Sequence, residues 1–245
     1  MMAESLDGLA LARRVALLPA PEPEPATPVA VPPSLLAGVR DALLAGDTHY
    51  TSRPGMPALR AHIASALARL GAPAFDPEQG VVVTSSERES LFVVLLANQR
   101  LRGLACTLET TPHQALFHFM GWGLGRCGDS ISPDTRLVYR EAGVPPAEHQ
   151  RALRSIEASG VIDVLNVSVR LARAEALPPI MAERTLVIGS GDGWPGQEAF
   201  GTGFVAGPAS LMNAIRTWKQ AFSICTAAPA QRAALLAFAQ REGAA

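Results

Sequence analysis

Short runs of branched apolar residues alternate along this chain with stretches of helical periodicity. "GVVVT" at 80–84 and "TLVIGS" at 185–190 are two such runs, and neither shows the polar–apolar alternation of a half-exposed strand. Strands that are apolar on both sides and separated by helices are typical of a mostly parallel sheet that is covered on both faces. The sequence therefore predicts a three-layer α/β fold with about six or seven strands.

The N-terminal part of the chain differs in composition from the rest. Residues 19–33 read "PAPEPEPATPVAVPP", which predicts an extended arm because proline is excluded from helix interiors. A short helix is predicted directly after it. We therefore expect an N-terminal arm with a short helix over 1–45 and one large domain over 46–245.

Composition and charge limit the classes of function. Of the 245 residues, 48% are hydrophobic and 18% are charged, which is typical of a folded domain. The formal net charge of −1 gives no support for nucleic-acid or membrane partners, and no apolar run is long enough to span a bilayer. We expect a cytoplasmic protein. The cysteines and histidines show no disulfide or metal-ligand spacing, so we predict no metal site and expect the histidines in packing or surface roles.

A glycine loop follows the apolar run at 185–190. Gly191, Gly193 and Gly196 match the G-x-G-x-x-G pattern of Rossmann-like nucleotide-binding enzymes, in which a helix begins at the loop. Here Pro195 and a second apolar run follow instead, so the context of that pattern is missing. Glycine amides can also hold a small anion such as phosphate, which is a further prediction for this loop.

Four segments, in order, resemble segments of the class I/II aminotransferases, the pyridoxal-phosphate-dependent enzymes of fold type I. They are "THYTSRPGMPALRAHIASAL", "GVVVTSSERESL", "FGTGFVAGPASLMNAIRTWKQ" and "CTAAPAQRAALLAF". The resemblance extends from about residue 15 to residue 242. It implies the large-domain fold of that family, in a chain that ends before the family's C-terminal small domain.

The resemblance also implies where the cofactor site lies. Ser190, and Ser86 and Glu87 at the start of a helix, correspond to positions that hold the cofactor phosphate, and Tyr50 belongs to the family's tyrosine turn. The spacing of Ser86 and Glu89 is independently that of a helix capping box. Glu87 is an unusual residue for a phosphate cup, because two negative charges repel.

The strand "VIDVLNV" corresponds to a family strand that carries a carboxylate for the pyridinium nitrogen. The resemblance puts Asp163 in that role and Asn166 in place of a tyrosine. A lone aspartate near a strand end is also common as a cap or turn residue, so both interpretations of Asp163 stay open.

The family's catalytic lysine has no counterpart. The resemblance puts that lysine at Gly193, the phosphate-binding arginine at Gly201 and the stacking aromatic residue at Thr110 or Thr111. Lys219, the only lysine of the chain, falls within a predicted amphipathic helix, where we expect its side chain to be solvent-exposed.

These observations predict a degenerate, non-catalytic aminotransferase-like protein that holds no cofactor. We expect it to act as a binding or structural partner, as a homodimer or together with an intact aminotransferase relative. The alternative is a pyridoxal-phosphate-dependent transaminase that acts on an amino acid. The second alternative is a Rossmann-like nucleotide-binding enzyme.

Overall fold

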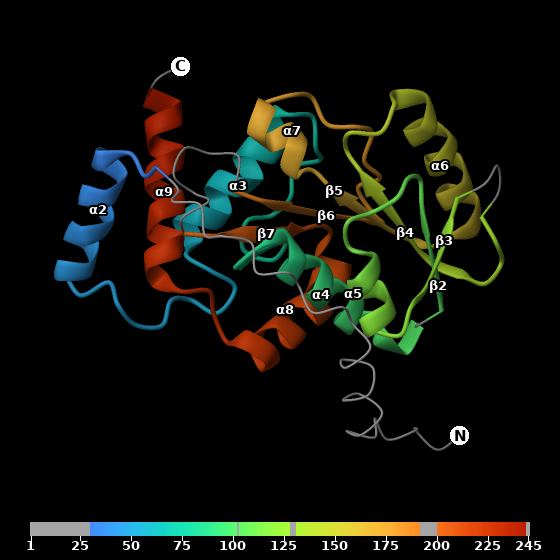
Figure 1. The fold of residues 1–245 in the computed structure, drawn as a ribbon, viewed down its shortest axis with the longest axis horizontal. Helices are drawn as coiled ribbons and strands as arrows, with labels where there is room; N and C mark the ends of the chain where they lie inside the picture. The colour runs from blue at the N-terminus through green and yellow to red at the C-terminus, as the bar shows by residue number, and fades with distance from the viewer. Residues whose placement is uncertain (1–29, 102, 128–130, 192–199, 244–245) are drawn as a thin grey trace.

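A computed structural model of the chain describes residues 30–101, 103–127, 131–191 and 200–243. Strands and helices alternate through most of these residues, as the sequence predicts (Figure 1). The strands are β1 (Val81–Thr84), β2 (Leu104–Thr107), β3 (Gly123–Arg126), β4 (Thr135–Glu141), β5 (Ile162–Asn166), β6 (Thr185–Ser190) and β7 (Gly203–Ala206). The helices are α2 (Pro33–Leu44), α3 (Pro57–Arg69), α4 (Glu87–Ala97), the short 3-10 helix η1 (Gln99–Leu101), α5 (Gln114–Phe119), α6 (Pro146–Ser159), α7 (Ser168–Arg173), α8 (Ala209–Ser223) and α9 (Ala228–Gly243).

The strands of the described residues form one seven-stranded sheet in the order β1-β7-β6-β5-β4-β2-β3. From β3 to β6 all neighbouring strands are parallel, whereas β7 is antiparallel to both β1 and β6. The predicted mostly parallel sheet is therefore confirmed. The strands on either side of the glycine loop are neighbours, with Ser190 paired to Gly203.

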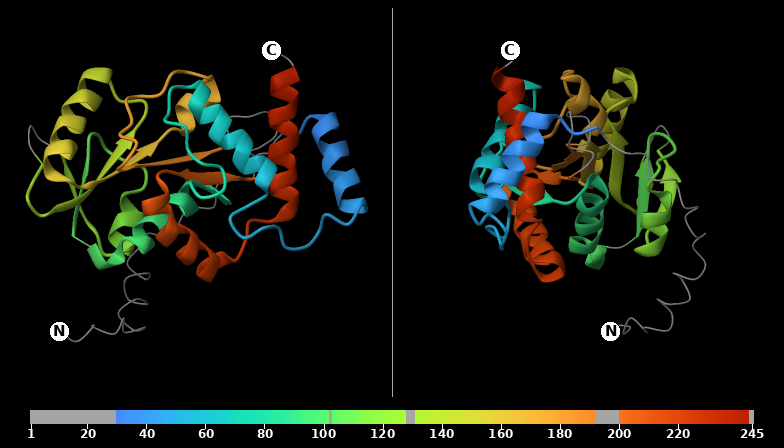
Figure 2. Two further views of the ribbon diagram at one scale, coloured as in Figure 1. Left: turned by 180° about the vertical axis from the view of Figure 1, so that it is seen from behind. Right: turned by 60° about the vertical axis from the view of Figure 1, so that its left-hand side comes forward.

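Helices cover both faces of the sheet (Figures 1 and 2). On one face α3, α7 and α9 pack around a core that includes Leu67, Val83 and Phe204. On the other face α4, α5 and α8 pack around a core that includes Leu91 and Ile188. The sheet is thus buried on both sides, which explains why its strands read as continuous apolar runs.

The sequence pattern does not predict two short elements, β3 and α7. β3 reads "GLGR" and lies at the edge of the sheet, with its first and last residues exposed. Two glycines and one leucine carry almost no strand signal. α7 has six residues, which is too short for a helical period to show.

α2 lies beside α9 at the end of the molecule away from β3 (Figure 2). The contact is made by Leu35 and Val39 of α2 and Ala233 of α9. The predicted arm lies largely outside the described residues, so the division of the chain at residue 45 stays a prediction.

Candidate functional site

The first turn of α4 is held by the side chains that were predicted to cap it. Ser86 Oγ accepts a hydrogen bond from the Glu89 N–H at 3.0 Å. The Glu89 carboxylate accepts from the Ser85 N–H at 2.5 Å and from Ser223 Oγ at 2.8 Å. The capping box is therefore present, with its return bond to residue 85 instead of residue 86. Because both Glu89 oxygens are engaged here, Glu87 is the acidic residue of this turn that reaches the sheet.

β7 runs against the backbone at the start of α4. A Cβ atom on Gly203 would lie 2.3 Å from Ser86 C and 2.4 Å from Ser86 O, well inside van der Waals contact. Glycine is therefore required at 203, and the close approach fixes the start of α4 relative to the sheet. Thr84 Oγ1 adds a hydrogen bond of 3.0 Å to Ser86 O.

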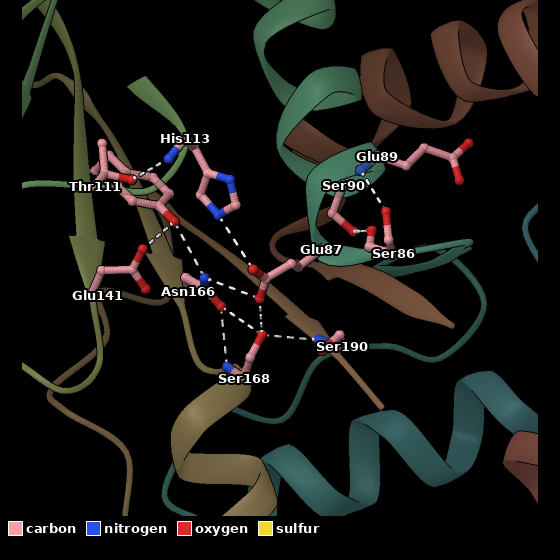
Figure 3. A network of polar contacts seen from close by, with 11 residues as sticks. Ser86, Glu87, Glu89, Ser90, Thr111, His113, Glu141, Asn166, Ser168 and Ser190 are labelled. Atoms are coloured by element: carbon pink, nitrogen blue, oxygen red, sulfur yellow. Dashed lines mark hydrogen bonds and ion pairs between the residues drawn. The ribbon is translucent and has the colours of Figure 1, made fainter. Parts of the chain in front are cut away.

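The Glu87 side chain extends from the first turn of α4 to the carboxyl end of β5 (Figure 3). Its Oε2 accepts hydrogen bonds from Asn166 Nδ2 at 3.2 Å and from Ser168 Oγ. Its Oε1 lies 3.3 Å from Nε2 of His113, whose side chain is 3% exposed. Asn166 ends β5, Ser168 begins α7 and His113 directly precedes α5, so groups far apart in the chain meet at one carboxylate.

Further hydrogen bonds connect this carboxylate to the ends of β4 and β6. Asn166 Nδ2 also donates to Tyr139 Oη at 3.2 Å, and Tyr139 Oη donates to Glu141 Oε1 at 2.7 Å. The Ser190 N–H donates to Ser168 Oγ at 3.1 Å. We call the following side chains the Glu87 network: Glu87, His113, Tyr139, Glu141, Asn166 and Ser168.

The two carboxyl groups of the Glu87 network have pKa values shifted in opposite directions. The His113 imidazole, followed by the hydrogen bonds from Ser168 and Asn166, outweighs burial and lowers the pKa of Glu87 from 4.5 to about 2. Burial raises the pKa of Glu141 above 4.5. Burial, with the neighbouring Glu141 carboxylate, also raises the pKa of the Tyr139 hydroxyl. Glu87 is therefore an anion at neutral pH, and the Tyr139 hydroxyl keeps its proton.

No family model matches the chain, but individual relatives do. A probable N-succinyldiaminopimelate aminotransferase of Mycobacterium tuberculosis is 26% identical over 238 residues, a match that covers 84% of this chain and 60% of that protein. The solved structure of N-succinyldiaminopimelate aminotransferase from M. tuberculosis superposes with a TM-score of 0.74 at 22% identity, covering 96% of this chain and 69% of the other. For the aromatic aminotransferase of Pyrococcus horikoshii the TM-score is 0.78 at 17% identity, covering 94% and 70%.

The chain has the aminotransferase fold and is homologous to the N-succinyldiaminopimelate aminotransferase of M. tuberculosis. Aspartate aminotransferase from Thermus thermophilus, solved with maleate, is a further structural neighbour, with a TM-score of 0.77 at 19% identity over 96% of this chain and 70% of the other. The fold class and the resemblance stated from the sequence are thus confirmed. The chain spans about 60% of the length of the curated aminotransferases it matches.

The structure brings together three of the residues that the aminotransferase resemblance singles out. Ser86 caps α4, Glu87 opens it, and Ser190 at the end of β6 contacts the Glu87 network through its N–H group. All three lie at the carboxyl ends of β1 and β6, the two strands that flank β7, and the carboxyl ends of strands are where open α/β sheets bind ligands. Their role in holding a cofactor stays a prediction.

Asp163 does not join them, and its assignment as a partner of the pyridinium nitrogen stays a prediction. Its side chain is fully buried and accepts two hydrogen bonds from Arg140, Nε to Oδ1 at 2.8 Å and Nη2 to Oδ2 at 2.5 Å. Asp163 and Asn166 are three residues apart on one strand, so their side chains point to opposite faces of the sheet. Asn166 is the residue of β5 that enters the site.

The contacts of Asp163 form a closed group beneath α6. Thr185 Oγ1 donates to Asp163 Oδ2 at 2.7 Å, and Arg140 Nη1 lies 3.0 Å from Nδ1 of His149. Burial and the neighbouring Arg140 lower the pKa of His149 from 6.5 to about 4, so the imidazole is neutral at pH 7. We call Arg140, Asp163, Thr185 and His149 the Arg140 cluster.

Tyr50 also lies apart from the Glu87 network. Its side chain is 67% exposed and its ring packs at a tilt against His49, with 4.6 Å between ring centroids. It lines an open groove together with Asp47 and Arg232, which form an ion pair. A role for Tyr50 in a cofactor site stays a prediction.

The expectation that Lys219 is solvent-exposed is wrong. Lys219 is 1% exposed, and its Nζ donates to Thr226 Oγ1 at 3.4 Å. Thr226 Oγ1 in turn donates to Val83 O at 3.2 Å, so the amine lies beside the edge of β1. Burial lowers the pKa of Lys219 below 10.5.

The orientation of α8 explains this error. The helix buries Met212, Ile215 and Lys219, which lie three to four residues apart on one face, and exposes Trp218 and Phe222 by 45% and 60%. The apolar pattern in the sequence suggested the reverse for Lys219. The long aliphatic stem of lysine allows it to pack among apolar side chains.

Several predictions about the loop concern residues outside the described ranges, including Gly193, Pro195 and Gly196, so anion binding there stays a prediction. Within the described ranges, no group of three or more His, Cys, Asp and Glu side chains could hold a metal ion. No helix in this part of the chain is long and apolar enough to cross a membrane. Cys106, Cys127 and Cys225 are free thiols.

Four members of the Glu87 network were not singled out from the sequence. His113 was assigned to packing or the surface, and Tyr139, Glu141 and Ser168 were given no role. One signal could have found them: each lies in or just after a predicted parallel strand, and the carboxyl ends of such strands meet at one edge of the sheet.

Proposed function

We propose that this chain is a non-catalytic protein of aminotransferase fold that acts as a binding or structural partner. The observation that carries the proposal is the position of its only lysine. Lys219 is buried in α8 with its amine on Thr226, and the position that the resemblance assigns to the Schiff-base lysine is Gly193. Transamination needs an amine that can form an aldimine with the cofactor at the end of the strand.

The residues present also do not fit pyridoxal phosphate, which the family implies. The start of α4, where the cofactor phosphate belongs, carries the ionised Glu87, and its carboxylate takes the donors of Asn166 and Ser168. The arginine that would pair with the phosphate corresponds to Gly201, whose backbone has φ of 60° and no side chain to offer. We therefore expect no cofactor.

For the partner, we propose a second copy of this chain or an intact aminotransferase relative. The resemblance implies a homodimer in which the arm and the tyrosine turn reach the neighbouring subunit, and Tyr50 is well exposed. Trp218, Phe222 and Ile224 are also exposed, by 45%, 60% and 48%, at the end of α8. Exposed apolar groups that lie together favour association with another protein. We place the protein in the cytoplasm.

One observation favours the alternative of an active transaminase that acts on an amino acid. Burial lowers the pKa of Lys219, which increases the share of the neutral, nucleophilic amine. The second alternative, a Rossmann-like nucleotide-binding enzyme, is disfavoured because the antiparallel strand β7 follows the loop where that pattern needs a helix.

The test is to incubate the protein with pyridoxal phosphate, reduce it with borohydride and map the labelled peptides. We expect label only at the N-terminal amine, or none. The matched control is Lys219→Met, which removes the only side-chain amine. Near-stoichiometric label at Lys219 that disappears in this variant, together with an amino-acid-dependent loss of the visible absorbance, would establish the active transaminase. The double variant Gly193→Lys/Gly201→Arg should retain more cofactor than the wild type.

A further inference from the structure

Three side chains with N–H or O–H groups, from separate parts of the chain, converge on the Glu87 carboxylate, and those of Asn166 and Ser168 form hydrogen bonds with it. Asn166 Nδ2 and Ser168 Oγ meet Oε2, and His113 Nε2 lies 3.3 Å from Oε1 (Figure 3). The donors lie at the end of β5, the start of α7 and the loop before α5, whereas the carboxylate comes from α4. A set of donors arranged around one oxyanion is the usual construction of an anion site.

The start of α4 contributes to the same place. α4 has eleven residues, and its dipole, together with first-turn N–H groups that have no carbonyl partner within the helix, favours negative charge there. The close approach of Gly203 to Ser86 holds this turn against the ends of β6 and β7. The negative charge at this end of α4 is the carboxylate of Glu87, the first residue of the helix.

The Glu87 carboxylate leaves the hydrogen-bonding groups of His113 without partners among the described residues. The His113 side chain is 3% exposed and points at Glu87, yet neither ring nitrogen makes a hydrogen bond of good geometry with any described residue. Buried polar groups are almost always hydrogen-bonded, because the cost of burial is otherwise not offset. A tetrahedral oxyanion offers more acceptor oxygens, in more directions, than the planar carboxylate does.

We propose that these donors form an oxyanion site that the chain closes with its own Glu87. In the wild-type protein the carboxylate occupies the donors and repels a second anion. Replacing Glu87 by a small neutral residue leaves Asn166, Ser168, His113 and the first turn of α4 facing a space that accepts an anion of the size of phosphate. This inference rests on the proposed function, because it explains why the cup no longer accepts a cofactor phosphate.

The test compares the binding of inorganic phosphate to the wild type, Glu87→Ser, Glu87→Gln and Glu148→Ser. Glu148 is the acidic residue in the first turn of α6 and is partly exposed, so its replacement makes the same charge change at another helix start. Binding is measured by calorimetry and by the rise in Tm with phosphate, with chloride at the same ionic strength as the reference.

We expect Glu87→Ser to bind phosphate at least tenfold more tightly than the wild type and Glu148→Ser. Glu87→Gln should bind phosphate no better than the wild type, because the glutamine amide fills the space that the carboxylate fills. If Glu87→Ser is unfolded in chloride, the proposal requires it to refold in phosphate, as followed by circular dichroism.

The proposal is overturned if Glu87→Ser binds phosphate no better than the wild type, if Glu148→Ser gains as much, or if an unfolded Glu87→Ser is not rescued. Inorganic phosphate has no aldehyde and cannot label an amine. Its binding is therefore independent of the borohydride experiment, and either proposal can fail while the other holds.

Discussion

The Arg140 cluster and the Glu87 network lie on opposite faces of the sheet. Each contains a carboxylate and a histidine, and they differ in how far their charged side chains are exposed to solvent. In the Arg140 cluster, both side chains of the ion pair between Arg140 and Asp163 are 0% exposed. In the Glu87 network, the Glu87 side chain is 26% exposed, and its carboxylate contacts neutral donors and one imidazole.

The difference follows from where each group lies on the strands. The Arg140 cluster joins β4, β5 and β6 beneath α6. Asp163 pairs with Thr185 in the sheet register, and Arg140 lies two residues along β4 from Val138, which pairs with Asp163. The Glu87 network lies at the strand ends, where loops and helix starts bring in groups from distant parts of the chain. We therefore expect the Arg140 cluster to stabilise the fold and the Glu87 network to be the place where a ligand site can be gained or lost.

The largest effect is expected when one partner of the buried ion pair in the Arg140 cluster is removed, which tests whether this cluster stabilises the fold. Arg140→Met leaves the Asp163 carboxylate buried without its counter-charge, so we expect a loss of about 3–5 kcal/mol in the free energy of unfolding. Urea denaturation measures it. The double variant Arg140→Met/Asp163→Leu should recover most of the loss, since an apolar pair needs no desolvation of charge. A single variant within about 1 kcal/mol of the wild type would contradict a structural role for this pair.

The second prediction concerns the contact that positions the Glu87 network. A methyl group on Gly203 would collide with the Ser86 backbone, so we expect Gly203→Ala to cost about 2–3 kcal/mol and to displace the start of α4. Denaturation gives the stability, and NMR shifts of His113 and Asn166 report the displacement. Gly143→Ala is the matched control, because a Cβ atom there has no neighbour within 4 Å. Equal effects of the two substitutions would show that the close contact at Ser86 does not position α4.

The smallest expected effect is that of Glu87 itself. Its pKa in the folded protein is about 2, below the 4.5 of the free side chain, so its ionised form stabilises the fold. This contribution is fully present above about pH 4.5 and is lost as the pH falls towards about 2. At pH 7 we expect Glu87→Gln to be less stable by about 1–2 kcal/mol, after allowing for screening of a partly exposed carboxylate.

The measurement is the unfolding free energy of the wild type and Glu87→Gln at a series of pH values. The difference between them should shrink through the acid range and disappear near pH 2. Glu148→Gln, at the start of α6, is the matched control for the loss of one carboxylate at a helix start. A difference that is constant with pH would mean that packing, and not charge, accounts for the effect of Glu87.

Much of the fold could be predicted because its signals are local. The apolar runs at β1 and β6 mark strands buried on both sides, and Ser86 with Glu89 marks the start of α4 through bonds within one turn. The edge strand β3 could not be predicted, since its pairing with β2 comes from backbone hydrogen bonds and not from its side chains.

The candidate site could be predicted only in part. The aminotransferase resemblance singles out Ser86, Glu87 and Ser190, and the structure brings these three together. His113 and Ser168 could not be assigned, because what they bind is the carboxylate of a residue that lies elsewhere in the chain.

The sequence by itself determined the order of the elements, the doubly covered sheet and the absence of a lysine at position 193. Only the tertiary structure decided which way Asp163 and Lys219 point. Because side chains alternate along a strand, Asp163 faces Arg140 and hydrogen-bonds to it. The packing of α8 against the sheet buries Lys219. The physical reason is that the chain's local chemistry sets which element forms, whereas the partner of a side chain depends on strand register and helix rotation, which arise only when distant segments pack together.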